Sequence, residues 1–460
     1  MVAHRAHLVT ASSGRGRSLR SRLAERATVD FAAFAAGTFV YQGGRLFLNL
    51  MAAAVLGPEA FGAWTLILLL VLYSNFASLG ISNGAGREIP FLLGAGRPED
   101  AARAEDVTVL GVGASGLVAA VIALGVGPFI LGDASATFPV VVLFSIAVLL
   151  QQFFLLQQVL LRSRFRFRPA AAQMLVLGIF TLLVGLPLLA LGLLGLAIAQ
   201  VAVYVVALLL ATRLLARAPR PAWDREIAQR LVSVGLPIML AGLLFGLLTT
   251  VDRWLVLLFL GRIQVGYYGL VGIAVSSLLL LPGIVSQQYY PRLAFTHGAG
   301  LGGKALLAFA TRQSLISGAF VAVAALPTAL VAWLAIPRFL PAYQDAVVPL
   351  LIVLVGLGVY GLGAAYGDLL NTIGAQRQYL AIQVLALAVN ISLSVLLLHA
   401  GMGLAGVATA TTTSMALYAV LLIARGRRLA KAIAPTPSGV EGAPNGATLR
   451  IQSLRIDDLD

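Results

Sequence analysis

The chain has no cysteine, only four histidines and few charged residues, which make up 11% of its 460 residues. Without cysteine it can form neither disulfides nor thiolate metal sites. A soluble domain usually carries about 25% charged residues, whereas 60% of this chain is hydrophobic. Ten-residue strands of alternating polarity are also missing, which argues against an outer-membrane barrel. These absences indicate an all-α integral membrane protein.

Apolar runs of about 20 residues recur along the chain, each long enough to cross a bilayer as a helix. We predict twelve transmembrane helices, at residues 29–56, 61–85, 106–131, 138–161, 170–191, 195–216, 231–260, 267–290, 305–335, 346–371, 379–400 and 404–425. With the N-terminus inside, 28 of the 32 Lys and Arg residues fall at or near one face. The positive-inside rule then predicts that both termini are cytoplasmic. The formal charge of +14 is therefore a topology signal, with anionic lipids as secondary partners and no nucleic acid.

Two halves of the chain share sequence motifs in the same order. The turn Leu56-Gly57-Pro58-Glu59-Ala60-Phe61-Gly62-Ala63-Trp64 returns as Leu260-Gly261-Arg262-Ile263-Gln264-Val265-Gly266-Tyr267-Tyr268. Further along, the segment 173–177 matches 383–387, and 192–199 matches 403–410. Both halves begin inside, so the repeat is parallel, and two such bundles can rock about a central site.

The repeat and the change in composition at the ends divide the chain into five parts. We expect a basic N-terminal tail (1–28), a six-helix bundle (29–216), a cytoplasmic linker (217–230), a second six-helix bundle (231–425) and a largely disordered cytoplasmic tail (426–460).

Arg45 lies about twelve residues from the outer end of its predicted helix, or roughly 18 Å at 1.5 Å per residue. In a hydrocarbon core about 30 Å thick, this position is close to the midplane. An arginine there costs roughly 2.5–3.5 kcal/mol on insertion scales, so it should face protein or water. The residues Thr38, Gln42, Arg45 and Asn49 share one helix face. This stripe fits the wall of a cationic cavity, or alternatively helix-to-helix contact with Arg45 bonded to backbone carbonyls.

In the repeat, Arg253 is equivalent to Asn49, and Thr249 is equivalent to Arg45. The first helix of each half therefore carries a cation on the same side. Asp252 is a candidate for proton or cation coupling, or for a structural ion pair with another helix. Asp368, near the inner end of its helix, is a second coupling candidate. We also expect Gln151, Gln152, Gln157 and Gln158 either to line an inward vestibule or to pack in the core.

These features resemble a known family. The motif at 56–64, followed by Leu79-Gly80-Ile81-Ser82-Asn83-Gly84 and Arg87-Glu88, and the segment Val251-Asp252-Arg253-Trp254 leading to the second turn, are similar to Wzx-type polysaccharide flippases of the multidrug/oligosaccharidyl-lipid/polysaccharide (MOP) superfamily. The resemblance implies two six-helix bundles around a cationic cavity in the bacterial inner membrane. It also implies transfer of undecaprenyl-pyrophosphate-linked oligosaccharide between leaflets, within exopolysaccharide or lipopolysaccharide synthesis. Other polysaccharide-assembly membrane proteins would then be partners.

From the resemblance we expect Arg45 and Arg253 to contact the pyrophosphate, and Gln42, Asn49 and Thr249 to contact sugar or phosphate oxygens. No cofactor or metal is expected, although proton or sodium coupling is an option. One alternative is a cation-coupled drug antiporter of the multidrug-extrusion (MATE) type, whose site would be net acidic. Another is a membrane-embedded glycan polymerase or glycosyltransferase, but every predicted outer loop is short and none holds a carboxylate pair. We therefore expect a transporter rather than an enzyme.

Overall fold

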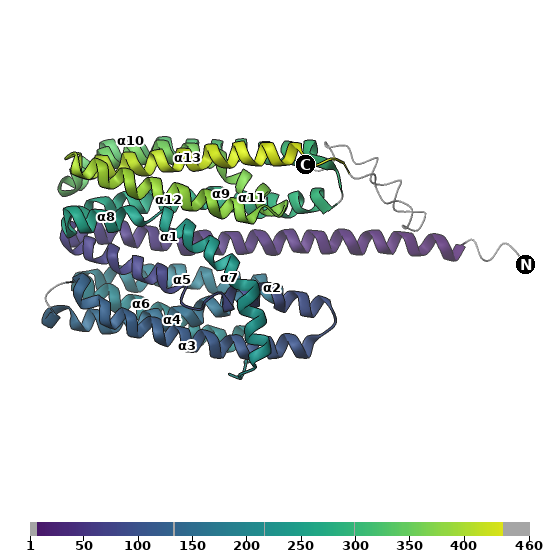
Figure 1. Cartoon of the computed structure of the whole chain (residues 1–460). Helices are drawn as coiled ribbons and strands as arrows, with labels where there is room; N and C mark the ends of the chain where they lie inside the picture. Colours follow the sequence, from purple (N-terminus) through teal and green to yellow (C-terminus); the bar gives the residue numbers. More distant parts are fainter. Residues whose placement is uncertain (1–6, 132–133, 216, 299, 436–460) are drawn as a thin grey trace, which may run out of the picture. The chain divides into compact units, whose positions relative to one another are not determined.

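The protein is described by a computed structural model that covers residues 7–131, 134–215, 217–298 and 300–435. Every regular element in this part of the chain is a helix (Figure 1). The elements are α1 (His7–Ser74), α2 (Ile81–Gly94), α3 (Pro98–Leu131), α4 (Ala134–Ser163), α5 (Phe167–Leu188), η1 (Leu189–Leu191), α6 (Gly192–Leu214), α7 (Arg225–Leu248), α8 (Val251–Leu260), α9 (Arg262–Gly298), α10 (Gly302–Phe339), η2 (Pro341–Ala346), α11 (Val347–Thr372), α12 (Gln376–His399) and α13 (Gly403–Lys431).

The helical membrane fold predicted from the sequence is confirmed. Among the described residues, 10 helical stretches are long and apolar enough to cross a membrane. Two of them, Ala33–Ser74 and Phe167–Ala211, each contain parts of two predicted spans. Each of the twelve predicted spans therefore lies mainly on helical residues, and the chain is a multi-pass membrane protein.

Two predicted spans are interrupted, which the sequence reading missed. The span 61–85 leaves the helix after Ser74 and re-enters it at Ile81, with Gly80 at φ 86°. The span 231–260 breaks at Thr249 and Thr250, whose hydroxyls donate to the carbonyls of Phe245 and Gly246. Such side-chain bonds give the backbone an alternative to the helical ladder.

The two breaks meet at a small polar contact. The hydroxyls of Tyr73 and Thr250 lie 2.5 Å apart, and Trp254 Nε1 donates to the Tyr73 hydroxyl at 3.3 Å. The rings of Tyr73 and Trp254 are stacked, with centroids 6.3 Å apart. These three side chains satisfy one another's polar groups, which would be costly to leave unpaired in an apolar environment.

The chain forms two compact units, Met1–Ile273 and Ala274–Asp460, so the boundary falls within α9. It lies later than the linker 217–230 because α7 packs against α2 of the first unit. A Cβ on Gly235 would lie 1.9 Å from the carbonyl oxygen of Gly80, and one on Gly84 would lie 2.1 Å from that of Leu231. The backbones thus touch directly, as in membrane helices that pack through small residues. The division into six-helix halves rests on the repeat and stays a prediction.

The backbone supports the repeat independently. Gly57 has φ 72° and ψ 172°, and its repeat partner Gly261 has φ 86° and ψ 178°. This combination is essentially restricted to glycine. Gly192 and its partner Gly403 also have positive φ, at 65° and 52°. The two halves therefore use the same turn conformations at equivalent places.

Helices extend into both of the regions that the sequence predicts to be tails. α1 begins at His7, so most of the predicted tail 1–28 continues the first helix. At the other end α13 continues beyond residue 425 to Lys431. The predicted disorder after that concerns mainly residues 436–460, which lie outside the described part of the chain.

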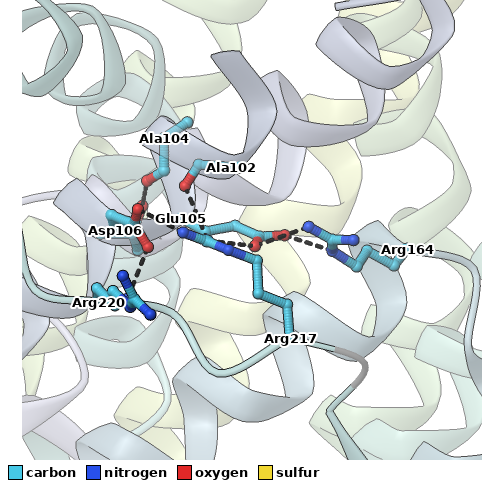
Figure 2. A network of polar contacts seen from close by, with 8 residues as sticks. Ala102, Ala104, Glu105, Asp106, Arg164, Arg217 and Arg220 are labelled. Atoms are coloured by element: carbon cyan, nitrogen blue, oxygen red, sulfur yellow. Dashed lines mark hydrogen bonds and ion pairs between the residues drawn. The ribbon is translucent and has the colours of Figure 1, made fainter. Parts of the chain in front are cut away.

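An ion-pair network fixes one end of the first unit (Figure 2). Glu105 of α3, whose side chain is only 3% exposed, accepts two bonds from Arg164, at 2.6 and 2.9 Å. Arg217 lies 3.6 Å from Glu105 and 2.7 Å from Asp106. Asp106 also accepts from the backbone N–H of Arg220 at 2.7 Å. The network therefore ties the start of α3 to the α4–α5 turn and to the connection after α6.

Hydrogen bonding to Glu105 raises the pKa of Arg164, and hydrogen bonding to Asp106 raises the pKa of Arg217. Both guanidinium groups thus stay charged at any physiological pH, and the network depends on the carboxylates.

Glu105→Gln should lower the thermal stability of the purified protein. The change leaves the guanidinium groups of Arg164 and Arg217 facing a buried neutral amide instead of a carboxylate. A buried polar group that loses its partner lowers the free energy of unfolding by about 1–3 kcal/mol. Asp100→Asn is the matched control, because Asp100 pairs with Arg97 on the surface and exposed pairs contribute about 0–1 kcal/mol. Equal melting temperatures for the two variants in detergent would contradict a stabilising role of Glu105.

Candidate functional site

The position of Arg45 follows from how α1 packs against α5. Gly37, Tyr41, Gly44 and Leu48 form the buried seam of α1. A Cβ on Gly37 would lie 2.5 Å from the carbonyl oxygen of Ala171, and one on Gly44 would lie 2.6 Å from that of Gly178. The close approach fixes the rotation of α1 about its axis.

Each residue of the predicted polar stripe directly follows a residue of this seam in the sequence, so the stripe lies beside the seam on the helix surface. Thr38, Gln42, Arg45 and Asn49 are each neither fully buried nor fully exposed. The stripe therefore runs along the edge of the α1–α5 contact, as the shared helix face predicts.

Arg45 lies beside a cluster of aromatic side chains. Its guanidinium carbon lies 5.6 Å from the centre of the Tyr41 ring, and Tyr204 of α6 interacts with both Tyr41 and Arg45. Phe154 of α4 completes the group, with its ring centre 6.0 Å from Tyr41 and 5.8 Å from Tyr204. Aromatic faces attract a cation without neutralising it.

None of the ion pairs found among the described residues involves Arg45. The structure therefore provides a positive charge, held over the Tyr41 ring, within an apolar helix. Such a group can bind an anion, since guanidinium matches phosphate oxygens in bidentate geometry.

The other residues of the polar stripe use some of their hydrogen-bonding groups within the protein. Asn49 Oδ1 accepts from Trp64 Nε1 at 2.8 Å, which leaves its amide N–H groups as donors. Thr38 donates to the carbonyl of Phe34 in its own helix. Gln42, one turn from Arg45, is half-buried. Of the stripe residues predicted to contact a ligand, Gln42 and Asn49 thus offer amide N–H donors beside Arg45.

Arg253 occupies a tighter place than Arg45. It is 6% exposed, and its Nε is a buried atom without a hydrogen-bond partner. Its guanidinium packs against Gly272 of α9, where a Cβ would lie 2.5 Å from the nearest nitrogen. Asp252, also buried, accepts from the Arg253 backbone N–H at 2.9 Å. Thr249 gives its hydroxyl hydrogen to its own helix, so it can only accept from a ligand.

Asp368, the second predicted coupling carboxylate, lies in the second unit. It accepts a hydrogen bond from Gln313 Nε2 of α10 at 2.5 Å and one from Ser286 of α9. The Oε1 atom of Gln313 is buried without a partner. Asp368 is thus held between three helices by neutral polar groups.

The four glutamines of α4 are core residues, the second of the two alternatives that the sequence left open. Gln158 donates to Gln173 at 2.6 Å, and Gln173 donates to Gln157 at 2.9 Å. The other two bond to the broken end of α1, Gln151 to Asn75 and Gln152 to Ser74. These side chains are 7% exposed or less. They bond to Gln173 and to the helix break, although the Oε1 atoms of Gln151 and Gln158 are buried without a partner. The sequence pattern alone does not distinguish this arrangement from a water-lined wall.

Sequence reasoning missed the two tyrosines beside Arg45. Tyr41 stands four residues before Arg45, a spacing that places two side chains on one helix face, so it could have been found. Tyr204 comes from a helix some 160 residues away, and only the packing of α6 brings it near.

Comparisons with known proteins agree with this architecture. A family model described as "Polysaccharide biosynthesis protein" matches residues 51–295, more than half of the chain. No curated protein matches the sequence. The fold is similar to that of an inward-facing multidrug resistance MATE family transporter of the MOP superfamily, with TM-score 0.75 and 15% identity over 88% of this chain and 98% of that chain.

Two further solved structures share the fold. One is a point mutant of the Vibrio cholerae MATE transporter VcmN, with TM-score 0.61 and 18% identity over 89% of this chain and 97% of that chain. The other is a MOP superfamily transporter from Pyrococcus furiosus, whose description notes a reverse polarity of its binding pocket, with TM-score 0.61 and 16% identity over 88% and 96% of the two chains. All three of these solved structures are of proteins described as transporters. The chain belongs to the polysaccharide biosynthesis protein family and has the fold of MOP superfamily transporters.

Proposed function

We propose that the protein is a flippase that moves undecaprenyl-pyrophosphate-linked oligosaccharide from the inner to the outer leaflet of the bacterial inner membrane. The observation that carries the proposal is Arg45, a cation in an apolar helix that is held over the Tyr41 ring and has no carboxylate partner among the ion pairs described. Membership of the polysaccharide biosynthesis family supports a glycan-bearing substrate.

In this proposal Arg45 binds the pyrophosphate, and Arg253 binds it when the surrounding helices admit the ligand. The Nε of Arg253 lacks a partner in the present packing. Gln42 and Asn49 donate to sugar or phosphate oxygens, and Thr249 accepts from sugar hydroxyls. Alternating access would follow from rocking of the two bundles about this site.

The alternative is a cation-coupled drug antiporter of the MATE type, which the fold alone accommodates. Asp252 and Asp368 are the observations that favour it, because buried carboxylates suit a cationic cargo or a coupling ion.

The deciding experiment uses purified protein in proteoliposomes that contain a lipid-pyrophosphate oligosaccharide. Flipping of the glycan lipid to the opposite leaflet supports the proposal. Failure of folded protein to flip several glycan lipids, together with cation-driven drug efflux, would establish the antiporter instead. Polymer formation from lipid-linked units would point to a glycan polymerase.

Coupling to an ion can be tested at Asp368. Moving one charge through 100 mV changes its energy by about 2.3 kcal/mol, so an imposed ion gradient can change the rate at which a charged substrate crosses. Asp368→Asn should remove the acceleration of flipping by an imposed proton or sodium gradient while leaving gradient-free flipping intact, since an amide oxygen can still accept from Gln313. Asp345→Asn, an exposed carboxylate of the same unit, is the matched control. A gradient response that survives in Asp368→Asn would exclude this residue as the coupling site.

A further inference from the structure

One end of the second unit carries a dense group of cations. It is formed by the end of α9, the start of α10, the α11–α12 turn and the end of α13. Hydrogen bonds join the end of α13 to α10 and to α12: Gly303 N–H donates to the carbonyl of Ile433 at 3.0 Å, and Arg425 Nε donates to Gln378 at 2.7 Å. We call this surface the basic end of the second unit; its members are Arg292, Lys304, Arg312, Arg377, Arg425, Arg427, Arg428 and Lys431.

These cations have almost no carboxylates to neutralise them. The described part of the second unit contains only two acidic residues, Asp345 and Asp368. Asp345 lies beyond the far end of α10, and Asp368 is occupied by Gln313 and Ser286. All but one of the eight cations, Arg425, are exposed.

The corresponding helix ends of the first unit are different. Carboxylates alternate with the arginines there and are engaged in ion pairs, as in Glu88 with Arg230 at 2.8 Å and Glu105 with Arg164. The acidic residues of these ends are Glu88, Glu99, Asp100, Glu105, Asp106, Asp224 and Glu226. A topology rule that counts only Lys and Arg does not explain why one unit compensates its charge and the other does not.

The basic end adjoins a helix wall suited to lipid chains. Along α10, after Lys304 and Arg312, large apolar side chains stand exposed at about half to three quarters of their surface; they are Leu315, Phe320, Val323, Leu326, Leu330 and Trp333. A phospholipid whose chains lie along this wall would place its headgroup among the cations of the basic end.

One of the arginines is already oriented for such a contact. Arg427 stacks over the Tyr366 ring at 5.7 Å and donates its Nε to the Tyr366 hydroxyl. Tyr366 in turn lies 3.2 Å from the Thr311 hydroxyl of α10. The guanidinium is thus positioned by side chains of two other helices, which lowers the entropy lost when it binds a phosphate.

We propose that the basic end of the second unit is a binding site for the headgroups of anionic phospholipids, and that the first unit has no equivalent site. The proposal does not depend on the transported substrate. Its chemistry is attraction between clustered Lys and Arg side chains and lipid phosphates, which is strong near an anionic leaflet and falls with salt.

The test uses the full chain in detergent with phosphatidylglycerol as the probe and phosphatidylcholine as the zwitterionic reference, read by native mass spectrometry. The variant Lys304→Gln/Arg428→Gln/Lys431→Gln should lose most of the retained phosphatidylglycerol, with an apparent affinity at least tenfold lower. The matched control Arg97→Gln/Arg103→Gln/Arg225→Gln removes the same charge from exposed arginines of the first unit and should retain wild-type binding.

Equal losses in both triple variants would overturn the proposal in favour of a diffuse positive field. Unchanged binding in the second-unit variant would also overturn it. Inorganic pyrophosphate at equal phosphate concentration should fail to displace the lipid; full displacement would identify a site for soluble phosphates instead.

Discussion

Arg45→Ala is expected to abolish export of the lipid-pyrophosphate oligosaccharide while leaving the amount of protein in the membrane unchanged. In the proposed site this guanidinium binds phosphate through charge-assisted hydrogen bonds, each worth about 1.5–3 kcal/mol. Loss of a bidentate pair would reduce flipping on the order of 100-fold or more. Membrane abundance should persist because alanine removes a costly charge from an apolar helix and leaves Tyr41, Phe154 and Tyr204 in mutual contact.

The measurement is flipping in proteoliposomes, with protein amount and melting temperature determined on the same preparations. Arg45→Lys should recover only part of the activity, since lysine keeps the charge but not the forked geometry. Arg338→Ala is the control, because it removes an exposed arginine at the far end of α10. If Arg45→Ala fails to accumulate or to fold, Arg45 is a structural residue that holds α1 to α6.

Much of the fold could be predicted from the sequence because membrane helices need long apolar runs, and these are visible in one dimension. The parallel repeat was also visible, since Gly57 and Gly261 occupy a backbone conformation that only glycine adopts readily. The breaks at 75–80 and at 249–250 were missed because a hydropathy profile does not detect a short interruption of an apolar helix. They exist where side chains of other helices, such as Gln152, satisfy the interrupted backbone.

The candidate site was predictable only along one helix. The stripe of α1 follows from helical spacing, and the structure places all four residues on the edge of the α1–α5 contact. Tyr204, which completes the surroundings of Arg45, depends on tertiary packing. For the glutamines of α4 the sequence pattern is ambiguous. The pattern also suits a vestibule, yet Gln173 of α5 pairs with two of these glutamines in the core.

Gly266→Ala is expected to destabilise the first unit by about 1–3 kcal/mol, the usual cost of forcing extra volume into a packed contact. A Cβ at this position would lie 1.8 Å from the carbonyl oxygen of Pro58, which is backbone and cannot rotate away. The start of α9 would have to separate from the turn of α1. The melting temperature in detergent should therefore fall by several degrees.

The repeat makes a second, linked prediction at Gly62. Gly62 and Gly266 hold the same position in the two halves, as do Pro58 and Arg262. The contacts are reciprocal as well: Gly266 meets the Pro58 carbonyl, and a Cβ on Gly62 would lie 2.3 Å from the Arg262 carbonyl oxygen. Gly62→Ala should therefore cost about as much as Gly266→Ala, and the double variant should cost less than the sum, because one separation relieves both clashes.

Gly125→Ala in α3 is the control, since no atom lies within 4 Å of its added Cβ and alanine is favoured over glycine in a helix by up to about 1 kcal/mol. Its melting temperature should stay level or rise. If Gly62→Ala and Gly266→Ala behaved like this control, the two turns would not be in contact in the folded protein. If both are destabilising to a similar degree, the reason that the turn at 56–62 is repeated at 260–266 is physical. Each copy provides both the carbonyl that the other copy's glycine approaches and the glycine that makes room for it.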